Sequence, residues 1–463
     1  MNATSTRTVV VEAGGTQVVG HVGLHALGAF ADRIGVGETL SGAIGWNGPG
    51  TPIHDRGRVL TQTMLMLAGG GESCADIEAL SSQERLFGDV CSDTTLYRTF
   101  TKTLTPDTVG QARRAMAQVR EQVWRRTSVT DGDESLVLDI DATLVEIHSE
   151  NKDGTGANYK SGFGFHPVFC FDDATGDALS GMLRAGNAAA NDTADLLTVV
   201  DDAISQIPPD MAAGHRPGDD PDLVERAVVV RSDSAGGTHV FTKGLRGRNI
   251  GFQVVTRTQT AISAAIATAN EDPDRWETAV DQDGSEAEPT DSGLAAAVCE
   301  VTDLVDMKGW PKGTRLIIRR QPKHPGAQTT LLPDLDYRFW GHYTDQAGDP
   351  VELDRQMRAH AHVEDHIQRL KDSGLERFPF TGWEANQAWL QTVMWATDLA
   401  SWFQLLCLVG PLAKAKPRRL RWTFWHAPAR IISTARRDIV RILDGWPTAD
   451  EIVAAYRAIA ALT

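Results

Sequence analysis

The spacing of hydrophobic residues predicts that the first 130 residues are mostly helical. Apolar side chains recur at intervals of three and four residues, and turns rich in Gly and Pro separate the helical segments. These segments are 21–34, 55–68, 74–80, 94–104 and 107–126, preceded by a short β segment at 8–11. The segments 74–80 and 94–101 have the layout of a helix-turn-helix unit, but the pattern favours an ordinary helical bundle.

From residue 135 the pattern changes to strands that alternate with helices. Strands are predicted at 136–147, 165–171, 178–184, 227–233 and 250–256. One helix begins at the cap Asn191-Asp-Thr and runs to Ile207, and a short one follows Gly236-Gly237. The order of three strands, helix, strand, helix and strand is typical of an α/β layered domain.

The last two hundred residues interrupt this order and then return to helices. An acidic low-complexity stretch at 270–293 precedes two predicted strands, at 314–320 and 337–344. The predicted helices are 354–373, 383–408, 427–443 and 448–461. The run 392–413 is apolar enough to resemble a membrane span, but Asp398, Gln404 and Pro411 favour a buried core helix.

Charge is distributed unevenly along the 463 residues, whose net charge is −16. Segments 201–222 and 271–306 carry net charges of −5 and −11, whereas 413–441 carries +8. A net negative charge argues against nucleic-acid binding, but the basic segment reverses that interpretation. Five cysteines without C-x-x-C spacing argue against a disulfide framework or zinc ribbon and favour a reducing compartment. The polar start Met1–Arg7 predicts no signal peptide.

Two acidic side chains, Asp141 and Asp233, lie at or near the ends of predicted strands. An ionised carboxylate in a β segment is costly to bury unless it is paired or bound to metal. Carboxylates on neighbouring strand ends can hold divalent cations, which activate a water or hydroxyl for in-line phosphoryl displacement. Asp139 competes with Asp141 because both lie on the same face of the strand. For any single acid, an edge-strand or N-cap role explains the position equally well.

A third acid, Glu364, lies in a predicted helix that is rich in charge and histidine. Lys371 follows Glu364 after two helical turns, so both side chains share a face. A metal-binding Glu with a Lys beyond it suits a catalytic edge that also grips the DNA backbone. Without the other acids, a solvated charged helix face is the simpler explanation.

Over most of its length the chain resembles bacterial insertion-sequence DDE transposases, and it looks most similar to the insertion-sequence-1380 group. The segments that carry the resemblance are Leu138-Asp-Ile-Asp-Ala-Thr143, Val229-Val-Arg-Ser-Asp233, the Glu364 helix and Phe378-Pro-Phe-Thr-Gly-Trp-Glu-Ala-Asn-Gln-Ala-Trp-Leu390. In this superfamily the Glu helix often reads Tyr-x2-Arg-x3-Glu-x6-Lys. This sequence keeps Glu and Lys but has Met357 and His360 in the other two positions. That departure weakens a phosphate-contact role for those two residues.

The resemblance implies an α/β protein with an RNase H-like (retroviral-integrase-like) catalytic domain. Residues 131–258 and 351–463 are expected to form that domain, 259–350 a β-rich insertion, and 1–130 a helical domain for DNA binding and dimerisation. Asp141, Asp233 and Glu364 are then expected to hold two Mg²⁺ or Mn²⁺ ions. The implied reaction is DNA strand cleavage at transposon ends followed by strand transfer into target DNA.

The same resemblance implies double-stranded DNA as the partner, both terminal inverted repeats and target. A homodimer is expected to bring two ends together, in the bacterial cytoplasm at the nucleoid and away from any membrane. The insertion is further expected to place an aromatic side chain near the transposon end, where unpaired bases stack. Trp310 and Trp340 are the candidates, although a core role is favoured for both.

The basic segment Lys414-Ala-Lys-Pro-Arg-Arg-Leu-Arg-Trp422 has the composition of a phosphate-contacting surface. Arg418, Arg419 and Arg421, together with Lys371, are the predicted DNA contacts. A solvated helix face explains this segment equally well by itself.

Two other functions fit parts of the sequence. The cluster of His360, His362 and His366 resembles a metallo-β-lactamase motif with one extra residue. This resemblance favours a metallohydrolase, although the helical pattern around the three histidines argues against that function. Alternatively, the chain is a transposase-derived DNA-binding protein that no longer cleaves. The five tyrosines, at 97, 159, 337, 343 and 456, lie in no recognisable nucleophile setting.

Overall fold

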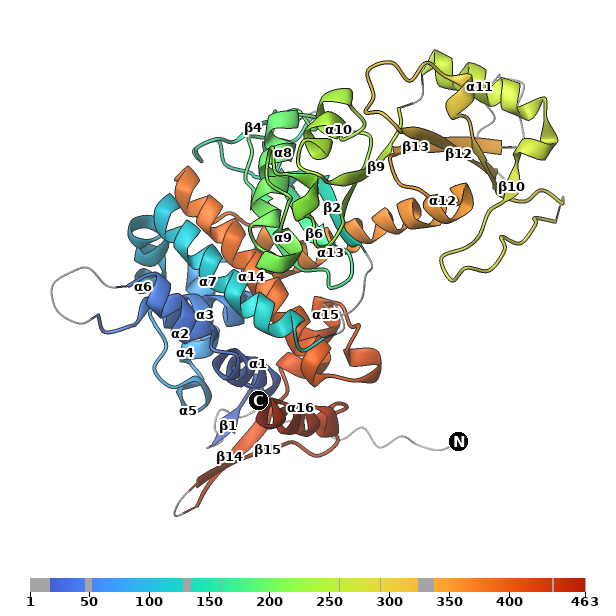
Figure 1. Ribbon diagram of the computed structural model, residues 1–463. Coiled ribbons are helices and arrows are strands. Elements are labelled where there is room, and N and C mark those ends of the chain that lie inside the picture. Colours follow the sequence, from blue (N-terminus) through green and yellow to red (C-terminus); the bar gives the residue numbers. More distant parts are fainter. Residues whose placement is uncertain are drawn as a thin grey trace, which may run out of the picture.

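The computed structural model describes residues 17–45, 52–127, 135–158, 160–257, 259–291, 293–323, 337–434 and 437–462. Its centre is a mixed sheet with helices on both faces, and a largely helical body lies beside it (Figure 1). The strand expected at 8–11 lies outside the described residues.

The large sheet has nine strands in the order β10-β11-β12-β13-β9-β8-β2-β6-β7. Their bounds, in chain order, are β2 (Leu136–Ala142), β6 (Val168–Asp172), β7 (Ala178–Met182), β8 (Val228–Ser232), β9 (Gly251–Val255), β10 (Glu277–Thr278), β11 (Ala297–Glu300), β12 (Arg315–Pro322) and β13 (Tyr337–Thr344). Strands β2, β8 and β9 run parallel, whereas β6 is antiparallel to β2 and β13 is antiparallel to β9. A separate small sheet contains β3 (Val145–Glu146), β5 (Phe163–Phe165) and β4 (Gly156–Ala157).

Alternation along the strands gives the large sheet two different faces. Leu138 and Ile140 of β2 pack in one hydrophobic cluster with residues of α8 (Thr193–Ile204) and α10 (His239–Arg246). Phe169 and Phe171 of β6 belong to another cluster, with α13 (His362–Leu370) and α14 (Trp383–Cys407). The short helix α9 (Pro209–Ala212) follows α8. Asp139 therefore points to the side of the sheet that α13 covers, where it contacts His360.

The N-terminal helices share one hydrophobic core with α14 and with this second face of the sheet. Their bounds are α1 (Val22–Arg33), α2 (Val36–Ala43), α3 (Arg56–Ala68), α4 (Glu78–Ser81), α5 (Glu84–Phe87), α6 (Asp93–Arg98) and α7 (Pro106–Trp124). The long helix α14 packs against α3 and α7 (Figure 1). Predicted helices in this region are confirmed at α1, α3 and α7, whereas α2 was not expected.

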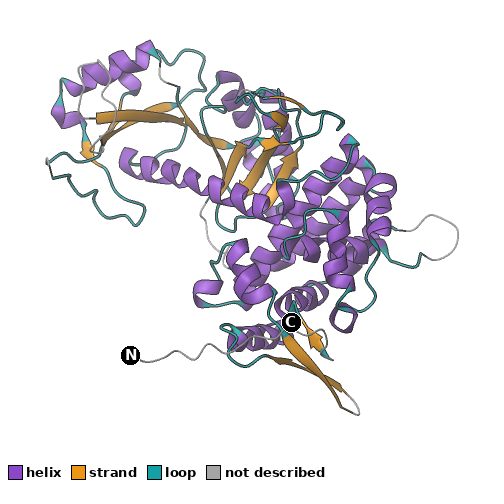
Figure 2. Ribbon diagram, turned by 180° about the vertical axis from the view of Figure 1, so that it is seen from behind, coloured by secondary structure: helices purple, strands orange, loops and turns teal. Residues whose placement is uncertain are grey.

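The segment expected to be an insertion continues the central sheet. Strand β13 pairs with β9 at residues 342–344, so β10 to β13 extend the sheet away from the helical body (Figure 2). Two helices flank these strands, α11 (Thr260–Asn270) and α12 (Pro350–Arg358). The helix α11, which buries Ile262, Ala265 and Ala269, was not predicted from the sequence.

The prediction of a helix at 427–443 is wrong. This segment forms a hairpin of β14 (Ala429–Thr434) and β15 (Arg437–Ile442), and β14 also pairs with β1 (Val18–Val19). Ala429 and Ile431 are buried whereas Arg430 is exposed, which is the alternation of a strand with one covered face. The helices α15 (Pro417–Leu420) and α16 (Ala449–Ala461) lie on either side of the hairpin in the sequence.

The apolar stretch that resembled a membrane span belongs mainly to α14, which lies inside the protein. No helix in the described part of the chain is long and apolar enough to cross a membrane. The polar residues Asp398 and Gln404 of α14 are buried, and both make hydrogen bonds within the protein.

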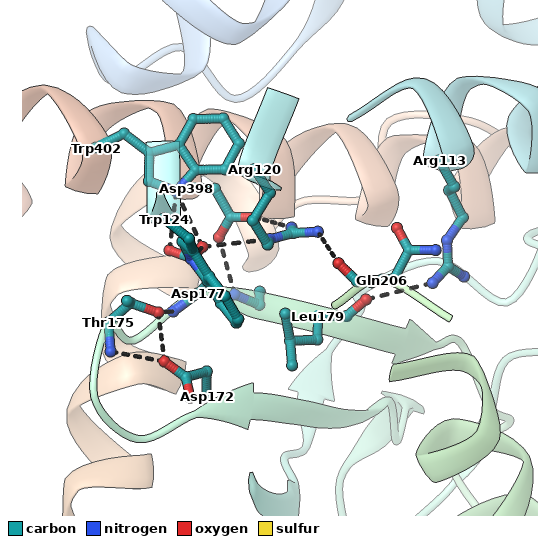
Figure 3. Close-up of polar contacts among 11 residues, drawn as sticks. Arg113, Arg120, Trp124, Asp172, Thr175, Asp177, Leu179, Gln206, Asp398 and Trp402 are labelled. Atoms are coloured by element: carbon teal, nitrogen blue, oxygen red, sulfur yellow. Dashed lines mark hydrogen bonds and ion pairs between the residues drawn. The ribbon is translucent and has the colours of Figure 1, made fainter. Parts of the chain in front are cut away.

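A buried polar cluster joins α7, α14 and the turn between β6 and β7 (Figure 3). The Arg120 guanidinium donates to Asp177 at 3.2 Å and to Asp398 at 2.7 Å. Asp177 also accepts hydrogen bonds from the indoles of Trp124 and Trp402, at 2.8 and 2.9 Å. Because all five side chains are almost completely buried, the cluster fixes the helical body against the sheet.

Replacement of Arg120 by Leu is expected to destabilise the protein strongly at pH 8. The change leaves two buried carboxylates without their cation, and breaking such a pair costs about 3–5 kcal/mol. The free energy of unfolding from urea titration measures this loss. Arg125→Leu, at the C-terminal end of the same helix, is the matched control, because Arg125 is exposed and ion pairs at the surface contribute little to stability. Equal effects of the two changes would contradict the role given to the cluster.

Protein stability is expected to fall as pH rises through 7 because of Asp172. Burial raises the pKa of this carboxyl from 3.8 to about 7, and Oδ1 has no hydrogen-bond partner. Between these two values the folded chain keeps a proton that the unfolded chain releases, so the stabilisation is present at low pH and lost above 7. In Asp172→Asn the decrease in the free energy of unfolding between pH 6 and pH 8 is expected to be smaller. Asp153→Asn, at an exposed carboxylate, is expected to leave the decrease unchanged.

Candidate functional site

Two of the predicted acids lie at the same end of two adjacent parallel strands. Asp141 is in the last part of β2, and Asp233 directly follows β8. The register pairs Ile140 with Ser232, so the two acids occupy the next position on strands about 4.8 Å apart. Backbone amides orient both carboxylates, since Asp141 accepts from Ala142 at 2.7 Å and Asp233 accepts from Ala235 at 2.8 Å.

The third acid, Glu364, lies in the first turn of α13, which packs against β2. Its side chain is exposed, whereas Val363 and Ile367 of the same helix are buried. The negative charge of Glu364 acts on Asp141, which places the helix acid close to the strand acids.

Asp141 experiences electrostatic repulsion from the other two carboxylates. Burial raises the pKa of Asp141 to about 6, and the negative charges of Asp233 and Glu364 contribute to that rise. A carboxylate surrounded in this way is stabilised by a cation. Carboxylate oxygens are also the ligands that Mg²⁺ prefers in proteins. The chemistry of the three side chains therefore fits a divalent cation.

Asp141, Asp233 and Glu364 do not form a ready-made metal-binding cluster. Within the described ranges no group of three His, Cys, Asp or Glu side chains is arranged so that it could hold a metal ion. A cation bound by Asp141, Asp233 and Glu364 needs further ligands, which water or DNA phosphate oxygens can supply.

Asp139, the alternative first acid, is occupied by other contacts. It is completely buried, and its carboxylate accepts hydrogen bonds from Arg231 at 2.6 and 2.9 Å and from His360 at 2.7 Å. Burial alone raises the pKa of Asp139, but these hydrogen bonds outweigh it and hold the pKa below its usual value. Asp139 therefore lies on the same face as Asp141 but has its oxygens directed to protein donors.

The three histidines of the possible metallohydrolase motif have separate surroundings. His360 contacts Asp139, and the exposed His362 lies 3.2 Å from Asp173. His366 is packed against Phe171 and Gly176, and burial lowers its pKa. Gly176 has a φ of +72°, and a Cβ atom there would lie 2.7 Å from the imidazole. These contacts give no common metal position for the three rings.

The predicted DNA-binding residues lie beside α13. Arg418 is 72% exposed and forms an ion pair with Asp372, which lies in the turn after α13, and Arg419 is also exposed. The backbone carbonyl of Asp372 accepts a hydrogen bond from Arg421. Arg421 is half-buried and already donates to this carbonyl, so it offers less to a phosphate than the exposed Arg418 and Arg419.

Further contacts attach the basic segment to the helix of the third acid. Lys416 forms an ion pair of 2.6 Å with Asp365, the residue next to Glu364. Lys371, at the end of α13, is half-buried. The basic segment is thus attached to the helix that carries Glu364.

The two tryptophans considered for base stacking are both half-buried. Trp310 stacks on Tyr343 with ring centroids 3.8 Å apart, and Trp340 lies 6.1 Å from the ring of His342. These contacts support the core role that the sequence favours for Trp310.

Sequence reasoning missed Arg231. It lies two residues before Asp233 in the strand motif, and an Arg inside an apolar β run is itself a signal of a buried ion pair. Its partners could not be identified, because Asp139 and His360 come from distant parts of the sequence.

Comparison with known proteins gives one match over the whole chain. The sequence model of the family described as "Transposase DDE domain group 1" matches residues 1–463. No curated protein matches the sequence. Among solved structures, the chain is similar to piggyBac transposase in a cryo-EM structure of its synaptic complex with hairpin DNA. The sequence identity is 11%, and the alignment covers 88% of this chain and 80% of that chain. The TM-score is 0.39, which is too low for this likeness to support a shared fold or function. By its match over all 463 residues, the chain belongs to the family of group 1 transposase DDE domains.

Proposed function

We propose that this protein is a DDE transposase that cleaves DNA at transposon ends and joins the freed ends to target DNA. The observation that carries the proposal is the placement of Asp141 and Asp233 at adjacent ends of parallel strands, with the helix of Glu364 packed against β2. Mg²⁺ or Mn²⁺ is the proposed cofactor, bound as a pair by these three side chains. Family membership supports the same function.

The finer fold assignment is part of this proposal. The strands β7-β6-β2-β8-β9 are adjacent in that order, with β6 antiparallel to β2, which itself runs parallel to β8. This order supports an RNase H-like catalytic core at residues 131–258 and 351–463, with 259–350 as the insertion. The helical residues 1–130 are then the proposed domain for sequence recognition and dimerisation.

The proposed reaction consists of two displacements at phosphorus. In the first, the oxygen of a water molecule attacks, the P–O3′ bond breaks, and a free 3′-hydroxyl remains. In the second, this hydroxyl attacks a target phosphate and loses its proton to solvent, while the target P–O3′ bond breaks. When bound, the divalent cations would activate the nucleophile and stabilise the negative charge on the leaving oxygen.

The residues of the chain hold and orient these groups. Asp141 and Asp233 are fixed by backbone amides at the strand ends, and Glu364 approaches from α13 on the exposed side. The basic residues beside α13 supply positive charge along the path of the DNA backbone. Alignment of nucleophile and phosphate is the main contribution of such a site, so no covalent protein–DNA intermediate is expected.

The proposed partner is double-stranded DNA, both the inverted repeats of the element and the target. Exposed Arg418 and Arg419, next to the Glu364 helix, support this assignment. A homodimer that joins two ends, a bacterial origin within the insertion-sequence-1380 group and action at the nucleoid belong to the same proposal. A derivative that binds DNA without cleaving it is the competing function, and a cleavage assay separates the two.

Glu364→Gln is expected to abolish both cleavage and strand transfer in the presence of Mg²⁺. The change removes a negative charge with little change in shape, so folding and DNA binding are expected to persist. Gel assays on DNA that carries the inverted repeats flanking the coding region measure both products. Asp141→Asn is expected to have the same effect.

Glu376→Gln is the matched control, since Glu376 is exposed and follows α13 without belonging to the site. It is expected to cleave at the wild-type rate. Normal cleavage by Asp141→Asn would show that the first acid is wrongly assigned. A denaturation-resistant protein–DNA adduct during cleavage would contradict the reaction.

Reversing Arg418 and Arg419 to Glu is expected to weaken DNA binding and to flatten its salt dependence. Each phosphate that the variant no longer neutralises reduces the magnitude of the slope of log K against log salt concentration by about 0.9. Fluorescence anisotropy over a range of NaCl concentrations measures the slope. Arg457→Glu in α16 is the control for a charge reversal at a site remote from the basic segment in the sequence. An unchanged slope in the double variant would assign DNA binding to another surface.

A further inference from the structure

Beneath the three proposed metal ligands lies a second set of three charged or ionisable side chains, from the same two strands and from the turn that leads into α13. Asp139 precedes Asp141 by two residues on β2, and Arg231 precedes Asp233 by two residues on β8. His360 precedes Glu364 by four residues, in the turn that leads into α13. Because residues two apart in a strand share a face, Asp139 and Arg231 lie on the same side as the acids above them.

These three side chains are bonded to one another. The Arg231 guanidinium meets the Asp139 carboxylate through two hydrogen bonds, Nε to Oδ1 at 2.9 Å and Nη2 to Oδ2 at 2.6 Å. The His360 Nδ1 lies 2.7 Å from the same Oδ1. Only 0%, 3% and 8% of the surfaces of Asp139, Arg231 and His360 are exposed. A two-point contact of Arg with a carboxylate fixes direction as well as distance.

The guanidinium of Arg231 also contacts two other parts of the fold. Its Nη1 donates to the backbone carbonyl of Gln356 in α12 at 2.7 Å. Its Nη2 also lies 2.8 Å from Asp173, in the turn after β6, and Asp173 in turn contacts His362 of α13. One guanidinium therefore joins β2, β8, the β6–β7 turn and the start of the helix that carries Glu364.

We propose that Arg231, with Asp139 and His360, is a positioning network that sets the spacing of Asp141, Asp233 and Glu364 for divalent-cation binding. The inference rests on the proposed function, because it assigns these acids as the metal ligands. The three carboxylates repel one another, so they cannot hold their own elements together. The network beneath supplies that bond from side chains on the same two strands and on the turn before α13. Residues that orient metal ligands in this way change metal affinity about 10- to 100-fold when they are replaced.

The main test is cation binding by Arg231→Lys in the full chain. Lys keeps the positive charge but cannot form the two-point contact with Asp139. Mn²⁺ alone, titrated without DNA and followed by electron paramagnetic resonance of the free ion, measures binding independently of turnover. The dissociation constant of Arg231→Lys is expected to rise about 10- to 100-fold. In cleavage assays the Mg²⁺ concentration for half-maximal rate is expected to rise in parallel, and saturating Mg²⁺ to restore most of the rate.

Arg319→Lys is the matched control. Arg319 of β12 is also buried, and it donates at 2.9 Å to the buried carboxylate of Asp354. The same substitution there disrupts a similar ion pair outside the proposed site. It is expected to lower the free energy of unfolding while leaving the Mn²⁺ dissociation constant unchanged.

A second pair of variants tests whether His360 acts through its hydrogen bond to Asp139 or through the volume of its side chain. In His360→Asn the side-chain amide can take the place of Nδ1 toward Asp139, whereas His360→Ala removes the donor. Mn²⁺ affinity is expected to fall in the Ala variant and to recover largely in the Asn variant.

The outcomes distinguish the inference from the proposed function. Unchanged Mn²⁺ affinity in Arg231→Lys and His360→Ala, with a wild-type protein that binds Mn²⁺ and cleaves DNA, overturns the positioning network alone. An equal loss of affinity in Arg319→Lys also overturns it, because the effect would then follow from stability. A wild-type protein that neither binds Mn²⁺ nor cleaves its terminal repeats overturns the proposed function, and the inference with it.

Discussion

Asp139 and Asp141 project from one face of β2, while Leu138 and Ile140 before and between them fill the hydrophobic cluster on the other face. This alternation places two carboxylates against a helix instead of in solvent. Each carboxylate then needs a positive partner, because burial of an isolated charge is costly. Asp139 receives Arg231 and His360 from the protein. Asp141 accepts a hydrogen bond from a backbone amide and has two more acids nearby.

The two acids differ in how their charge is compensated. The carboxylate of Asp139 is neutralised by protein donors and belongs to the architecture. The carboxylate of Asp141 has no such cationic partner, and the negative charges of Asp233 and Glu364 raise its pKa. Buried carboxylates are also neutralised within the protein at the β6–β7 turn. There Arg120 forms ion pairs with Asp177 and Asp398 (Figure 3). That cluster contains its own cation and two indole donors, so it is complete without a ligand.

The parts of the structure with strict local patterns were predictable from the sequence. The strands β2 and β8 are apolar runs that end near an acid, and α7 begins at Thr105-Pro106 with a hydroxyl cap. The hairpin β14–β15 was missed because Ile431-Ile432 and Ile439-Val440 fit a helical period as well as a strand. The partners of Arg231 could not be predicted, since the sequence separates it from Asp139 by 92 residues. Only the packing of α13 on β2 brings His360 to the same point.

The pairing of β13 with β9 has a mechanical consequence. Three residue pairs join these strands, and the backbone of Phe252 is held further by Thr344 and Asp345. Since β9 lies beside β8, the strand that leads to Asp233, the outer strands belong to the same hydrogen-bonded sheet as this acid. A load on the outer strands is therefore expected to be transmitted as twist along paired strands. The outer strands and the end of β8 are thus expected to move together as one body.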